Sequence, residues 1–126
     1  MQRNLVIEVA AWLEIIVGAT LVVALNFASQ LLFATAPEGL AAAMGRFAGI
    51  ALFALGIASL GSTKPGSGGT APLGLLVFNT GAAIFLAWVA VGNVFRGVLL
   101  WPAVVLHAVI ACALLWTSLS STPRES

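Results

Sequence analysis

Four long apolar segments, separated by shorter connections, dominate the pattern of the chain. They run approximately over residues 5–25, 40–60, 72–92 and 98–118. A bilayer core of about 30 Å requires roughly 20 apolar residues in an α-helix, so each segment is long enough for one crossing. The pattern therefore predicts an all-α membrane protein, in which residues 1–126 form a single domain of four transmembrane helices.

The connections predict how these helices pair. Residues 61–71 are rich in glycine, serine and threonine, which predicts a flexible linker. Residues 93–97 form a short connection, so the last two helices should be antiparallel neighbours. Residues 26–39 mix polar and apolar side chains and contain Pro37 and Gly39, which indicates an interfacial turn or a frayed helix end. The expected architecture is an up-down bundle of two helical hairpins.

Composition supports a membrane location. Hydrophobic residues make up 61% of the chain and charged residues 7%, whereas about one-quarter of an ordinary soluble domain is charged. Such a surface needs lipid around it, so the bilayer is the expected surroundings. The formal net charge of +1 and the lack of a basic cluster exclude a nucleic-acid partner. No cofactor and no metal site is predicted, because His107 and Cys112 lie on different faces of one helix.

The positive charges predict an orientation. Arg3, Lys64 and Arg124 lie on the side of the termini and the linker, whereas Arg46 and Arg96 lie towards the other side. Since Lys and Arg are in excess on the cytoplasmic side, both termini should be cytoplasmic, in a bacterial inner membrane. The difference is small, so a dual topology is an alternative.

A stripe of small residues marks the second predicted helix. Gly45 and Gly49 are four residues apart, and Gly56 follows seven residues later. Transmembrane helices approach closely where small residues allow it, so this stripe predicts a packing face. The face can pack against another helix of the same chain, or it can bind a second copy or a partner membrane subunit.

Three polar residues are predicted to lie inside the membrane. Glu14 in the first helix and His107 in the fourth have small residues one turn away, so both should face other helices. At 1.5 Å per residue, these two lie about 14 to 17 Å from the end that holds the termini, and Asn79 in the third helix lies at roughly 10 Å. Helices one and four are adjacent in an up-down bundle, so the three side chains should form one polar layer.

This layer has two interpretations. Its members can simply hydrogen-bond to one another and hold the bundle together, at about 1 kcal/mol for each link. Alternatively, Glu14, Asn79 and His107 are catalytic or ligand-binding residues, because an intramembrane ionisable residue is a functional hypothesis by default. Arg46 is a further ligand-binding candidate, or else an interfacial anchor that can pair with Glu38.

Two short segments resemble parts of known families. The segment GRFAGIALFALGI, from Gly45 to Ile57, resembles the second helix of small DoxX-like four-span bacterial membrane proteins. That resemblance implies the architecture and no single activity. The segment LEIIVGATL, from Leu13 to Leu21, is similar to the first helix of small multidrug resistance transporters. It implies that Glu14 binds protons and cations in turn, although this chain has no tyrosine for the aromatic cage of that family.

Three functions follow from these observations. The first is a small accessory membrane protein that binds a lipid-soluble ligand or a partner membrane subunit. The second is a proton-coupled transporter of small molecules that uses Glu14 and His107. The third is an intramembrane isomerase or cyclase acting on an isoprenoid-like substrate, with Glu14 as the acid and His107 as the base.

Overall fold

Each of the four apolar segments forms one long helix. The structure is a computed structural model that describes residues 2–64 and 70–120, without the side chains of residues 2 and 3. Four of its helices are long and apolar enough to cross a membrane. They are α1 (Gln2–Val23), α3 (Gly39–Gly61), α4 (Ala71–Val91) and α5 (Leu100–Leu119).

A fifth, short helix occupies part of the connection that the sequence predicts as a turn or a frayed helix end. The first long helix stops at Val23, and the chain continues from Ala24 into α2 (Leu25–Phe33). This helix forms because Leu25 and Ser29, one turn apart, are both buried against the bundle. Ala34 ends α2 in the left-handed conformation, with a φ of 55°.

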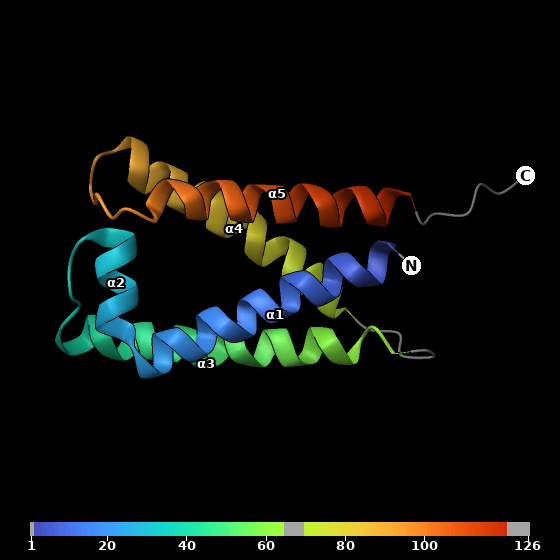
Figure 1. The fold of residues 1–126 in the computed structure, drawn as a ribbon, viewed down its shortest axis with the longest axis horizontal. Helices are drawn as coiled ribbons and strands as arrows, with labels where there is room; N and C mark the ends of the chain where they lie inside the picture. The colour runs from blue at the N-terminus through green and yellow to red at the C-terminus, as the bar shows by residue number, and fades with distance from the viewer. Residues whose placement is uncertain (1, 65–69, 121–126) are drawn as a thin grey trace, which may run out of the picture.

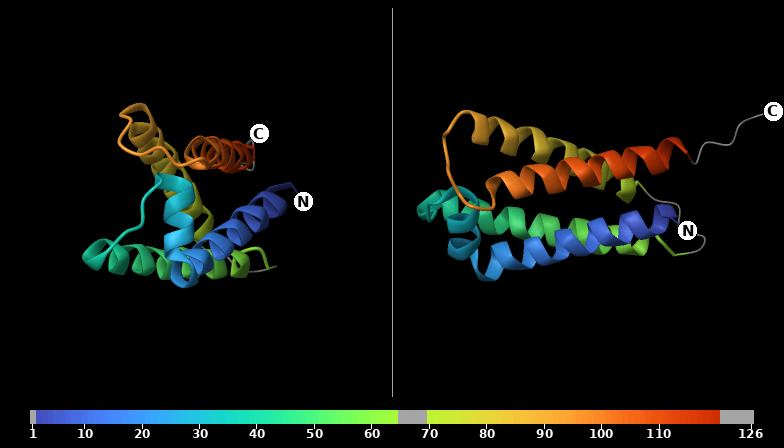
Figure 2. Two further views of the ribbon diagram at one scale, coloured as in Figure 1. Left: turned by 60° about the vertical axis from the view of Figure 1, so that its left-hand side comes forward. Right: turned by 45° about the horizontal axis from the view of Figure 1, so that its top comes forward.

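The helices pair as two antiparallel hairpins, as predicted. Along most of their length α1 packs on α3 and α4 packs on α5, whereas contacts between the two pairs are sparser. Both views in Figure 2 show α4 and α5 on one side and α1 and α3 on the other, and the right-hand view shows α2 at one end. The all-α, up-down arrangement of two hairpins is therefore confirmed.

Both ends of the described chain lie at the same end of the bundle. Figure 1 shows the start of α1 and the end of α5 at one end, and α2 with the connection between α4 and α5 at the other. Residues 65–69 of the predicted linker, the side chain of Arg3 and residue Arg124 lie outside the described residues.

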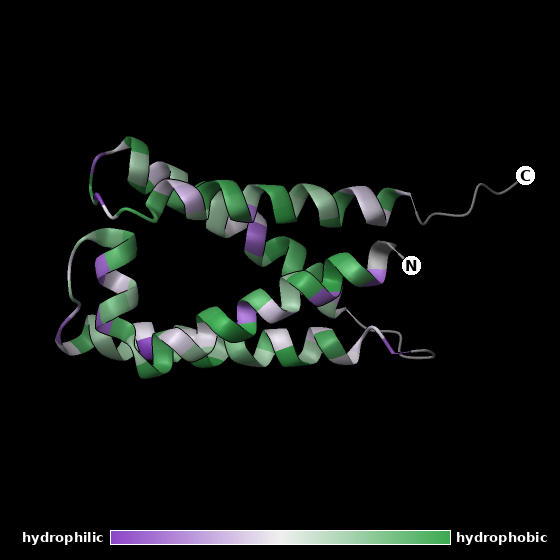
Figure 3. Cartoon of the chain, viewed as in Figure 1, coloured by the Kyte–Doolittle hydropathy of each residue, from purple (hydrophilic) through white to green (hydrophobic). Residues whose placement is uncertain are grey.

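The long helices expose hydrophobic residues over most of their outer surface, which defines a multi-pass integral membrane protein. Figure 3 shows hydrophobic colour along the four long helices and only short hydrophilic bands between. Exposed side chains include large apolar residues on each of these helices, such as Trp12, Phe47, Trp88 and Trp116. Such a surface is stable in lipid and not in water.

The glycine stripe of α3 packs within the chain. A Cβ added to Gly49 would lie 2.8 Å from the carbonyl oxygen of Gly18 in α1, and one added to Gly56 would lie 2.6 Å from that of Ala11. One added to Gly45 would lie 2.8 Å from Leu25 Cδ1. The stripe therefore lets the backbone of α3 touch α1 and lets α2 pack close by, which is the intrachain alternative.

Candidate functional site

The three polar residues predicted inside the membrane lie together, where α1, α4 and α5 meet. Glu14 comes from α1, Asn79 from α4 and His107 from α5. Glu14 is 1% exposed and Asn79 is completely buried, whereas His107 is partly exposed. Asn79 lies between the other two and contacts both, so the three side chains form one hydrogen-bonded chain across the hairpins.

Hydrogen bonds fix the orientation of the Asn79 amide. Asn79 Nδ2 lies 2.9 Å from the carbonyl oxygen of Leu75 and 3.1 Å from Glu14 Oε1. A backbone carbonyl can only accept a hydrogen bond, so the amide nitrogen of Asn79 must face it. This nitrogen thus donates both of its hydrogens, one to Leu75 and one to Glu14.

The same chain of contacts fixes the tautomer of His107. Asn79 Oδ1 lies 2.8 Å from His107 Nδ1, and an amide oxygen can only accept. His107 Nδ1 therefore carries a hydrogen and donates it to Asn79. In a neutral imidazole only one nitrogen is protonated, so Nε2 presents its lone pair.

An aromatic contact also supports the imidazole ring. Phe78 and His107 meet edge to face, with ring centroids 5.8 Å apart and an interplanar angle of 79°. Edge-to-face pairs are a preferred aromatic geometry. Two residues of α4 thus contact the ring of His107: Asn79 through Nδ1, and Phe78 through the edge-to-face contact.

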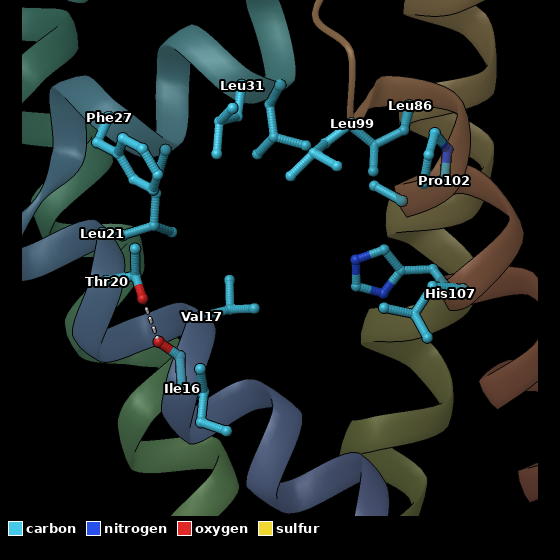
Figure 4. A pocket seen from close by; sticks show the side chains of 14 residues that line it. Ile16, Val17, Thr20, Leu21, Phe27, Leu31, Leu86, Leu99, Pro102 and His107 are labelled. Carbon is cyan, nitrogen blue, oxygen red and sulfur yellow. Dashed lines mark hydrogen bonds between the residues drawn. The ribbon is translucent and has the colours of Figure 1, made fainter.

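A pocket of about 310 Å³ lies beside His107, between the two hairpins. Figure 4 shows the ring of His107 projecting into this pocket from α5, opposite Val17 and Thr20 of α1. The walls come from α1, α2, α4, α5 and the residue preceding α5. The lining residues are Ile16, Val17, Thr20, Leu21, Phe27, Ala28, Leu31, Leu32, Leu86, Leu99, Pro102, Ala103, Leu106 and His107.

One end of the pocket is formed where α2 meets the connection between α4 and α5. The N–H of Leu99 donates a hydrogen bond of 2.9 Å to the carbonyl oxygen of Leu31. Gly97 lies against the backbone of Leu31 and Leu32, and a Cβ at this position would overlap both. This close approach positions the Leu31, Leu32 and Leu99 side chains, which all line the pocket.

Only two lining side chains are polar. Thr20 Oγ1 donates a hydrogen bond of 2.7 Å to the carbonyl oxygen of Ile16, one turn earlier in α1 (Figure 4). His107 is the other, and all remaining lining side chains are hydrocarbon. The site is therefore an apolar pocket with two isolated polar groups.

The other candidates do not reach this pocket. Arg46 is exposed on α3, and Glu14 and Asn79 lie behind His107 and outside the pocket lining. Cys112 is exposed on α5 and does not line it either. Of the four predicted ligand-binding residues, His107 alone touches the pocket.

Sequence reasoning missed the apolar part of the site. Thr20, Phe27 and Leu86 line the pocket, but in the sequence they resemble other residues of transmembrane helices. The one available signal was the polar and aromatic mixture after residue 25, which could have indicated a helix lying across the end of the bundle.

The fold and the site define a class of protein: a multi-pass α-helical membrane protein in which a buried polar chain ends at an apolar pocket. Comparison of the chain with family models, with curated proteins and with solved structures finds no match in any of the three.

Proposed function

We propose that this protein is a small accessory membrane protein that binds a lipid-soluble small molecule in the pocket between its two hairpins. The observation that carries this proposal is the pocket itself, at about 310 Å³, with hydrocarbon walls and one imidazole projecting into it. Ligand sites are commonly clefts of roughly 300 to 1,000 Å³ that are mostly apolar and contain a few placed polar groups.

The rim of the pocket supports entry from the bilayer. Phe27 is 63% exposed and Ile16 is 58% exposed, yet both side chains line the pocket. Ile16 lies on the outer surface of α1, one of the four helices apolar enough to cross a membrane, where lipid is the surrounding solvent, and Phe27 lies on the adjoining α2. A molecule dissolved in the bilayer can therefore reach the pocket without crossing water.

Two features favour ligand binding over the alternatives. A proton relay between Glu14 and His107 would have to pass through Asn79, whose amide donates and accepts hydrogen bonds but neither loses nor gains a proton at ordinary pH. An isomerase needs its acid and its base within reach of the substrate, and Glu14 does not line the pocket. Ligand binding requires neither a proton path through Asn79 nor contact between Glu14 and the ligand.

Photolabelling tests this proposal. The protein is reconstituted in phospholipid nanodiscs, exposed to an apolar phenyl diazirine, irradiated and mapped by mass spectrometry. We expect saturable labelling of pocket residues, because a pocket has a limited capacity, whereas labelling of lipid-facing residues should rise linearly with the probe.

A matched pair of variants identifies the pocket as the labelled site. Ala103→Trp fills the pocket from α5, and Val109→Trp places the same side chain on an exposed position of that helix. The first should abolish saturable labelling and the second should preserve it. Labelling that is not saturable, or that survives Ala103→Trp unchanged, would contradict ligand binding in this pocket.

A further inference from the structure

We infer that the ligand is an apolar molecule that bears a hydroxyl group, and that this hydroxyl donates a hydrogen bond to His107 Nε2. The inference rests on the proposed binding of a lipid-soluble molecule and goes further by naming its chemical class. Lipid alcohols and phenols share this chemistry, whereas ketones, aldehydes, ethers and esters without a hydroxyl lack it.

The first step is the fixed direction of the hydrogen bonds behind His107. The carbonyl oxygen of Leu75 accepts from Asn79, so Asn79 turns its own oxygen towards His107 Nδ1. The imidazole must donate from Nδ1. In the neutral ring Nε2 is then an acceptor, and the ring projects into the pocket (Figure 4).

The second step is the state of the Thr20 hydroxyl. Its single hydrogen is given to the carbonyl oxygen of Ile16 at 2.7 Å. The oxygen keeps lone pairs and can only accept from a ligand. Both polar groups that line the pocket therefore present acceptors, and the other lining side chains present hydrocarbon.

The third step follows from complementarity. A ligand hydroxyl supplies the donor that the pocket lacks, whereas a carbonyl or ether oxygen would place its lone pairs opposite those of Nε2. Desolvating a polar group without a partner is unfavourable. The pocket should thus distinguish molecules of similar shape by whether they can donate a hydrogen bond.

Glu14 acts in this scheme as a positioning residue. Its Oε1 atom accepts one of the two Asn79 N–H bonds, and Leu75 accepts the other. Because Glu14 and Leu75 take both amide hydrogens of Asn79, only the oxygen of Asn79 is left to bind His107, and it can only accept. The buried carboxyl thereby helps to select the tautomer of a ring that it does not touch.

Three related probes test the inference: geraniol, geranyl methyl ether and geranial. Each competes with the saturable diazirine label in nanodiscs of one lipid composition, and affinities are expressed per concentration in the bilayer. Geraniol should bind about twofold to tenfold more tightly than the other two, which is the range expected for one net hydrogen bond.

The variant His107→Phe keeps a planar ring and removes the acceptor. In this variant geraniol and the methyl ether should bind about equally, because the loss of Nε2 removes both the hydrogen bond to the hydroxyl and the repulsion of the ether oxygen. The comparison in the unaltered protein needs no variant, so a His107→Phe protein that failed to fold would leave the test intact.

The outcomes separate the two proposals. If the ether or geranial competes as well as geraniol in the unaltered protein, the hydroxyl inference is wrong and ligand binding stands. If none of the three competes and labelling is not saturable, ligand binding in the pocket is wrong and the hydroxyl inference falls with it.

Discussion

Asn79 uses every hydrogen-bonding group of its side chain inside the membrane. Its nitrogen donates hydrogen bonds to the carbonyl oxygen of Leu75 and to Glu14 Oε1, and its oxygen accepts one from His107 Nδ1. A side chain with both a donor and an acceptor is needed here, because Glu14 Oε1 accepts on one side and the Nδ1–H of His107 donates on the other. Among the described residues, no buried side-chain nitrogen or oxygen lacks a partner.

The tautomer of His107 can be measured directly. Because His107 is the only histidine in the chain, nitrogen NMR of histidine-labelled protein reports on this ring alone. We expect the neutral ring to be predominantly the Nδ1–H form, since the protonated nitrogen is set by the hydrogen bond it makes.

Asn79→Leu supplies the comparison, because leucine is close to asparagine in shape and accepts no hydrogen bond. The population of the Nδ1–H form should fall in this variant. A predominantly Nε2–H ring in the unaltered protein would contradict the proposed direction of the hydrogen bonds.

At the scale of the elements, glycines mark a close contact between α1 and α3. A Cβ added to Gly18 would lie 2.6 Å from both the carbonyl oxygen of Gly49 and the backbone nitrogen of Phe53. These atoms belong to helix backbones and cannot move aside as a side chain can. The two helices therefore tolerate nothing larger than glycine at this crossing.

Gly49→Leu should separate α1 from α3 and lower the free energy of unfolding by about 1 to 3 kcal/mol, the usual cost of overpacking a core. Gly81→Leu is the matched control, since a Cβ at Gly81 meets nothing within 4 Å. Thermal unfolding in one detergent compares the two. Equal stability of the two variants would show that the crossing is not tightly packed.

The helices were largely predictable from the sequence, and the pocket was not. The long apolar segments ended within a few residues of the observed helices, because crossing a bilayer imposes a length. The meeting of Glu14, Asn79 and His107 followed from depth and from small neighbouring residues. In contrast, Leu86 and Leu106 line the pocket, and no local pattern separates them from apolar residues that face lipid.

α2 was missed for a different physical reason. Nine residues are too few for a stable isolated helix, so no local signal predicts this element strongly. Its helix depends on tertiary packing of Leu25 and Ser29, and on the backbone contact of Leu31 with Leu99. Such contacts are visible only once the bundle is assembled.

At the scale of the whole molecule, the two hairpins place Ser120 and Glu38 at opposite ends of the bundle. Ser120 follows α5, at the end that holds the start of α1, and Glu38 precedes α3 near α2 (Figure 1). Both residues are exposed. If the helices cross a membrane, these two residues face different compartments.

Cysteine labelling tests this topology. In a Cys112→Ala background, Ser120→Cys and Glu38→Cys are treated in intact bacterial cells with a membrane-impermeant thiol reagent. With cytoplasmic termini, as the positive charges predict, Glu38→Cys should react and Ser120→Cys should not until the cells are opened. The reverse pattern would invert the orientation, and partial labelling of both would indicate a dual topology.

The hydrogen bond between Glu14 and Asn79 joins residues 65 positions apart in sequence. A ribosome therefore delivers the carboxyl of α1 to the bilayer long before it delivers the amide in α4. During that interval Glu14 lacks the Asn79 amide, and a polar group without its partner is costly inside a membrane. Insertion of the second hairpin supplies this hydrogen bond, so the second hairpin should stabilise the first.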